Sequence, residues 1–190
     1  MKNFIVGSIA LYCFGMMIYA VWSYLAFVGL DKMEWVGSLI YLPHGVRVMA
    51  MCYFGYRSIP ALYAIELTGP IMVYPEQYFD VWPIASIASL LSVVAACEIV
   101  KWSNSNTKGT IFMPINFTNY RSLVLVIVLS GLLNAISSNL VTSLLAGIDL
   151  SVTVIARFFV GDVLGSFVLV LFLSALFTTL RVNRLLVSDK

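Results

Sequence analysis

The chain has 190 residues, of which 61% are hydrophobic and 11% are charged, and its formal net charge is +2. An average soluble domain is about 45–50% apolar and about 25% charged, so a soluble protein of this length could not bury so much apolar surface in one core. The small net charge and the lack of a basic run argue against a nucleic-acid partner. The composition therefore predicts a protein whose partner is the lipid bilayer.

Six apolar stretches follow one another along the chain. A helix needs about 20 residues to span a bilayer, because the hydrocarbon core is about 30 Å thick. The first stretch is longer than a signal-peptide core and has no small-residue cleavage site, so we expect it to stay in the protein as a helix. The chain is thus predicted to be a single all-α transmembrane domain over residues 1–190. The predicted spans are 4–28, 35–56, 58–74, 81–100, 122–147 and 150–180.

The lysines and arginines fall in every second connecting segment. With the N-terminus inside, the outer segments carry only Lys32, and the inner segments carry the other basic residues that lie outside the spans. Basic residues favour the cytoplasmic side of a membrane protein. We therefore predict that the N- and C-termini are both cytoplasmic. The inner basic residues are Lys2, Arg57, Lys101, Lys108, Arg121, Arg181, Arg184 and Lys190.

Five ionisable side chains lie deep inside the predicted spans, and Glu98 lies near the inner end of the fourth span. A charge at the bilayer centre costs about 2.5–3.5 kcal/mol on the insertion scale, so each of these side chains must face a partner or a cavity. Counted from the span ends at about 1.5 Å per residue, they share one layer between the outer half of the bilayer and its midplane. They are the candidate ligand-binding residues: His44, Arg47, Glu66, Arg157 and Asp162.

The spacing of these residues predicts some of their contacts. His44 and Arg47 are three residues apart and share a helix face. Arg157 and Asp162 are five apart and point about 140° away from each other, so we expect them to reach different neighbours. An interhelical pair of Arg47 with Asp162 is predicted. Three interpretations stay open: ion pairs that fix helix packing, a polar pocket for a small ligand, and a proton or ion pathway. In a pocket, the three basic side chains would favour an anionic ligand.

Glycine and proline mark expected points of close helix packing. Gly161 and Gly165 are four apart, and such a small-xxx-small pattern lets another helix backbone come close. Pro43 and Gly45 flank the histidine of the second span. We interpret them as a kink, or as unwound backbone that opens toward a cavity.

No sequence pattern indicates catalysis. Cys13, Cys52 and Cys97 lie in apolar stretches without the spacing of metal ligands, so we interpret them as buried thiols. The chain has no Gly-x-Ser-x-Gly and no His-Glu-x-x-His motif. We therefore expect no enzymatic activity, no catalytic residue, no metal and no cofactor.

Two stretches resemble a known family of membrane domains. Residues 43–45 (Pro-His-Gly) and 55–61 (Gly-Tyr-Arg-Ser-Ile-Pro-Ala) are similar to the proline-glycine helix and the Gly-x-Arg-x-x-Pro turn of the MASE1 domain. Residues 157–165 (Arg-Phe-Phe-Val-Gly-Asp-Val-Leu-Gly) are similar to a late helix of that family. The motifs cover the second, third and sixth predicted spans.

The resemblance implies a sensory module of the bacterial inner membrane, which binds a small ligand and regulates an output domain. MASE1 domains usually have more spans than six and are fused to a kinase, cyclase or phosphodiesterase, whereas no such domain follows the sixth span here. We therefore expect a partner protein to carry the output. The architecture also resembles the substrate-binding subunits of energy-coupling-factor transporters, whose partners supply the energising ATPases. A third interpretation is a non-catalytic scaffold or accessory subunit.

Overall fold

The computed structural model describes residues 2–29, 39–72, 80–103, 120–147, 149 and 151–188. Within these residues the chain is helical and contains no strand, which confirms the predicted all-α class for this part. A 3₁₀ turn, η1 (Gly55–Ser58), joins the second helix to the third, and another, η2 (Pro70–Met72), follows the third. The helices are α1 (Lys2–Gly29), α2 (Leu42–Phe54), α3 (Ile59–Thr68), α4 (Trp82–Ser103), α5 (Tyr120–Ala146) and α6 (Val152–Ser188).

Four of these helices are long and apolar enough to cross a bilayer, and they match the first, fourth, fifth and sixth predicted spans. Each has at least 22 residues, more than the roughly 20 predominantly apolar residues that a spanning helix needs. The chain thus has the build of a multi-pass membrane protein. The four stretches are Phe4–Leu25, Trp82–Ser103, Tyr120–Ala146 and Val152–Leu180.

The second and third predicted spans differ from the structure. The helices found there have 13 and 10 residues, so they are about 20 Å and about 15 Å long, short of the bilayer core of about 30 Å. Gly55, with φ at 58°, ends α2, because a left-handed backbone does not continue a helix. Residues 35–38 and 73–74 of these spans lie outside the described residues. Six spans and cytoplasmic termini stay predictions. Lys32, Lys108 and Lys190, which support the orientation, also lie outside the described part.

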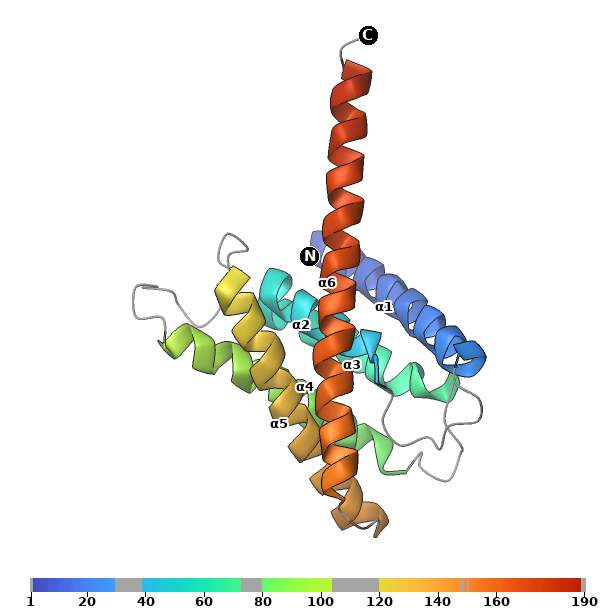
Figure 1. The fold of residues 1–190 in the computed structure, drawn as a ribbon, viewed down its shortest axis with the longest axis vertical. Coiled ribbons are helices and arrows are strands. Elements are labelled where there is room, and N and C mark those ends of the chain that lie inside the picture. Colours follow the sequence, from blue (N-terminus) through green and yellow to red (C-terminus); the bar gives the residue numbers. More distant parts are fainter. Residues whose placement is uncertain are drawn as a thin grey trace.

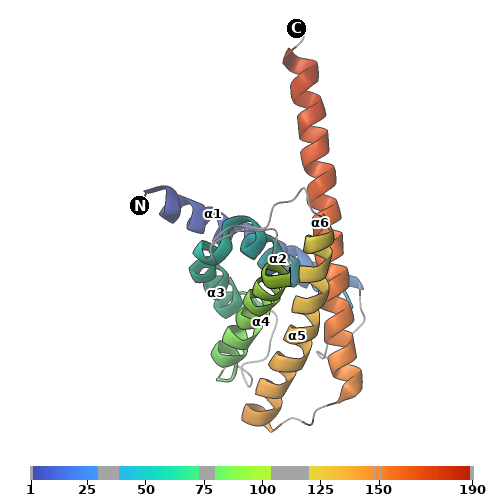
Figure 2. The same ribbon diagram turned by 90° about the vertical axis from the view of Figure 1, so that its left-hand side faces the viewer.

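The helices do not form a parallel bundle. Helix α5 packs against both α4 and α6, and the three lie side by side in Figure 2, whereas α4 crosses behind α5 in the view of Figure 1. Helix α1 crosses α6 steeply and packs instead on α2 and α3, which lie between α1 and the other helices. The C-terminal half of α6 projects well beyond the other helices.

The start of α2 is held against the middle of α6 by a close backbone contact. The Tyr41 N–H donates to the Gly161 carbonyl at 2.9 Å, and a Cβ on Gly165 would overlap the backbone of Tyr41. A Cβ on Gly45 would lie 3.0 Å from the Cα of Ser166. Pro43 is fully buried in the first turn of α2, where a proline is tolerated because the N–H that it lacks would have no helical partner. This junction brings His44 of α2 next to Asp162 of α6.

The orientation of the chain can be tested by cysteine labelling. In cells that carry the Cys13→Ser variant, Cys52 and Cys97 remain but are only 1% and 2% exposed. A membrane-impermeant maleimide is expected to label Asp149→Cys, in the link between α5 and α6, on intact cells. It should label Arg121→Cys, at the other end of α5, only after permeabilisation. Labelling in the reverse order would contradict cytoplasmic termini.

Candidate functional site

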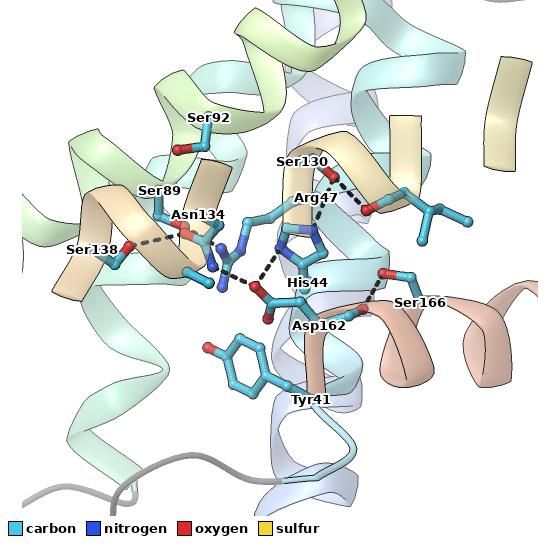
Figure 3. A network of polar contacts seen from close by, with 12 residues as sticks. Tyr41, His44, Arg47, Ser89, Ser92, Ser130, Asn134, Ser138, Asp162 and Ser166 are labelled. Carbon is cyan, nitrogen blue, oxygen red and sulfur yellow. Dashed lines mark hydrogen bonds and ion pairs between the residues drawn. The ribbon is translucent and has the colours of Figure 1, made fainter. Parts of the chain in front are cut away.

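A buried set of polar side chains lies where five helices meet, and Figure 3 labels all of them except Glu66 of α3. Each of these side chains is at most 5% exposed. We refer to them as the polar cluster. Helix α2 supplies His44 and Arg47, α3 supplies Glu66, α4 supplies Ser89, α5 supplies Ser130 and Asn134, and α6 supplies Asp162.

Arg47 forms its ion pair with Glu66. The Arg47 Nε and Glu66 Oε1 atoms are 2.7 Å apart, although the N–H direction does not meet the geometry of a hydrogen bond. Another guanidinium nitrogen, Nη1, donates to the Ser89 hydroxyl, and the guanidinium carbon lies 5.3 Å from the centre of the Tyr41 ring, within cation–π range. Arg47 was predicted to pair with Asp162, and it pairs with Glu66 instead.

Asp162 is contacted by α2 and α5. His44 Nδ1 lies 3.6 Å from Asp162 Oδ2, and Asn134 Nδ2 donates to the same oxygen at 2.6 Å. The Ser138 hydroxyl donates to Asn134 Oδ1 at 2.9 Å, which is consistent with the Asn134 amide turning its nitrogen toward Asp162. The other carboxylate oxygen, Asp162 Oδ1, has no hydrogen-bond partner among the described residues.

Four of the five predicted site residues are brought together, and Arg157 is not. Arg157 is half-buried, and the hydrogen bonds and ion pairs of the polar cluster in the described part of the chain do not include it. The separation follows from helix geometry, because residues five apart point about 140° away from each other. The packing residues Pro43, Gly45, Gly161 and Gly165 all lie at the junction of α2 with α6.

The neutral members of the polar cluster were missed by the sequence reasoning. Ser89, Ser130 and Asn134 carry no charge, and a polar uncharged residue in an apolar helix is a weak signal. A serine in a helix can bond to its own helix, as Ser92 does with the Ala88 carbonyl at 2.8 Å. Asn134 was the most detectable of the three, since an amide cannot satisfy all its hydrogen-bonding groups in lipid.

The electrostatics of the polar cluster do not favour an anion. The expectation of an anionic ligand depended on three basic side chains that face one site. Arg157 lies apart, Arg47 is already paired with Glu66, and the Asp162 carboxylate adds a negative charge next to His44. An anion placed here would lie beside the Asp162 carboxyl group in a medium of low dielectric constant, and Arg47 could balance it only by leaving Glu66.

The side chains of Ser130, His44 and Asp162 follow one another as the nucleophile, base and acid do in the triad of a hydrolase. His44 Nε2 lies 3.0 Å from the Ser130 hydroxyl oxygen. That hydroxyl is fully buried within α5 and also lies 3.2 Å from the Ile127 carbonyl, to which it can donate. A nucleophile must reach a substrate carbonyl and needs oxyanion donors nearby. The arrangement therefore does not favour hydrolysis. In the described part of the chain, no group of three or more His, Cys, Asp or Glu side chains is placed to hold a metal ion.

Comparisons of the chain with protein families, with curated proteins and with solved structures find no match. The resemblance to MASE1 domains therefore stays a prediction that rests on two motifs. Asp162, Gly161 and Gly165 belong to the later motif, and His44 belongs to the earlier one.

Proposed function

We propose that this protein is a bacterial inner-membrane module of the sensory type, which binds a small ligand at the polar cluster and conveys its occupancy to a partner protein. The observation that carries the proposal is Asp162 Oδ1. This oxygen belongs to a side chain that is 1% exposed, and no described residue donates to it. Leaving a buried acceptor unpaired costs about 1–3 kcal/mol, so a ligand that donates to it would be favoured.

The ligand we propose carries an N–H or O–H group. A carboxylate oxygen only accepts hydrogen bonds, so its partner must be a donor. Arg47 cannot serve an anion without losing Glu66. Small amines, amides and alcohols therefore fit the Asp162 side better than carboxylates or phosphates do.

Helix α6 supports the part of the proposal that concerns the partner. From Asp162 the helix continues without a break to Ser188, a distance of about 39 Å at about 1.5 Å per residue. A shift of α6 at the polar cluster would thus be carried to its far end. A partner with an output domain would make this a MASE1-like sensor. A partner with an ATPase would make it a transporter subunit of the energy-coupling-factor type.

One observation favours a second candidate, a scaffold or accessory subunit. Apart from Asp162 Oδ1, the charged groups of the polar cluster all face a partner, through the Arg47–Glu66 pair and the contacts of His44 with Ser130 and Asp162. Buried pairs of this kind can simply fix how helices pack. In that case the polar cluster would hold α2, α3 and α6 together and bind nothing.

Ligand binding at Asp162 can be tested by thermal unfolding of the purified protein in lipid nanodiscs. One panel contains small amines, amides and alcohols, and a matched panel contains carboxylates and phosphates. We expect compounds of the first panel to raise the Tm of the wild type and of Arg157→Gln, because Arg157 lies apart from the polar cluster. The same compounds should leave the Tm of Asp162→Asn unchanged.

The exposed Asp149 provides the matched control, since Asp149→Asn removes one carboxylate elsewhere and should keep the ligand response. Stabilisation only by anions would contradict the proposed ligand class. A wild type that responds to neither panel, with Asp162→Asn unable to fold, would favour the scaffold.

A further inference from the structure

The charges of the polar cluster do not balance. Arg47 supplies one positive charge, while Glu66 and Asp162 supply two negative charges, and none of the three is more than 3% exposed. The other titratable groups near these side chains are His44 on α2, Tyr41 before it and Tyr19 on α1. Helices α4 and α5 contribute only uncharged Ser89, Ser130 and Asn134. An uncompensated charge costs several kcal/mol in such surroundings, so the polar cluster needs one more positive charge.

The two contacts of Ser130 favour one position for a ring proton of His44. The Ser130 hydroxyl has a single hydrogen, and the Ile127 carbonyl at 3.2 Å can only accept it. When Ser130 donates there, its oxygen accepts from His44 Nε2 at 3.0 Å. Both contacts are hydrogen bonds only when His44 carries a proton on Nε2.

The other ring nitrogen shows where the missing charge belongs. His44 Nδ1 faces Asp162 Oδ2 at 3.6 Å. With the ring neutral and the carboxylate ionised, a lone pair would face a negatively charged oxygen. A proton on either atom removes this repulsion, because it makes either an imidazolium beside a carboxylate or an imidazole beside a carboxylic acid. Both arrangements give the missing positive charge.

We propose that His44 and Asp162 form a proton-binding site, in which one proton held between Nδ1 and the carboxylate neutralises the polar cluster. Because His44 belongs to α2 and Asp162 to α6, the bound proton also joins these two helices. The inference does not depend on the ligand proposed above, since it follows from the charges and the hydrogen-bond roles of the described side chains. The alternative tautomer, with Nδ1 protonated and Ser130 donating to Nε2, leaves the polar cluster with a net negative charge.

The chain has a single histidine, which makes the test direct. The full chain is labelled with [¹⁵N]histidine, purified through a tag without histidine and placed in lipid nanodiscs at neutral pH. The ring ¹⁵N signals then report which nitrogens carry hydrogen, and infrared spectra report whether a carboxyl group is protonated. We expect Nε2 to be protonated. We also expect either a second N–H signal at Nδ1 or a protonated-carboxyl band that disappears in Asp162→Asn.

Two outcomes would overturn the proposal. In both, no carboxyl band depends on Asp162 and the His44 ring is neutral. The single ring hydrogen lies on Nδ1 in the first outcome and on Nε2 in the second. Asp149→Asn is the matched control and should leave both spectra unchanged. If Asp162→Asn does not fold, [4-¹³C]aspartate in the wild type replaces the infrared comparison, because its carboxyl shift separates the acid from the carboxylate. Ligand binding to a site that lacks this proton would leave the previous proposal standing and would reject this one.

Discussion

Arg47→Met is expected to lower the free energy of unfolding by about 3–5 kcal/mol, because removing one partner of a buried ion pair leaves the other charge unpaired. Arg47 is 3% exposed and is the only positive charge that the described part of the chain places in the polar cluster, apart from any on His44. Its loss would leave Glu66 and Asp162 as two buried carboxyl groups that both need a proton. The Ser89 hydroxyl would also lose its donor.

Glu66→Gln should lower the free energy of unfolding by less than Arg47→Met does. After Glu66 is neutralised, the Asp162 carboxylate can still balance the arginine. The double variant Arg47→Met with Glu66→Gln should recover part of the loss, since both members of the pair are then uncharged. Chemical unfolding in mixed micelles measures the free energy of unfolding of the wild type, the two single variants and the double variant. The four values form a double-mutant cycle. An additive double variant would contradict the pairing of Arg47 with Glu66. Equal losses in the two single variants would contradict the idea that Asp162 balances the arginine when Glu66 is neutral.

The fold class followed from composition, and the number of spans did not. Runs as apolar as Trp82–Ser103 and Val152–Leu180 can only form helices in lipid, so their prediction needed no knowledge of packing. The region of α2 and α3 is also largely apolar, but its glycines and prolines decide where helices stop. Gly55 adopts a positive φ, which the sequence permits without requiring it. The lengths of α2 and α3 were for this reason not predictable.

The sequence predicted which charged residues belong to the polar cluster better than it predicted which of them pair. The cost of a charge in lipid identified His44, Arg47, Glu66 and Asp162, because that cost depends only on depth. Pair formation depends on how each helix is rotated and on which helix lies next to it. Arg47 is directed to α3 rather than α6, and the sequence carries no signal for that choice.

Gly165→Ala is expected to lower the free energy of unfolding by about 3 kcal/mol. This is the upper end of what overpacking a core costs. The new Cβ would overlap the backbone of Tyr41, which cannot rotate away as a side chain can. To make room, the start of α2 must leave α6, and the hydrogen bond from the Tyr41 N–H to the Gly161 carbonyl would break. The displacement would also pull His44 from Asp162.

Two other helical glycines give matched controls for this effect. A Cβ on Gly131 would lie 3.2 Å from Val163 Cγ2, a side-chain atom that can shift, so Gly131→Ala should cost less than Gly165→Ala. A Cβ on Gly7 meets nothing within 4 Å, and Gly7→Ala should be neutral or stabilise α1 by up to about 1 kcal/mol through its helix propensity. Unfolding measured for the three variants should rank them in this order. A Gly165→Ala protein as stable as Gly7→Ala would mean that α2 and α6 do not approach at Tyr41, and the geometry that brings His44 to Asp162 would then fail with it.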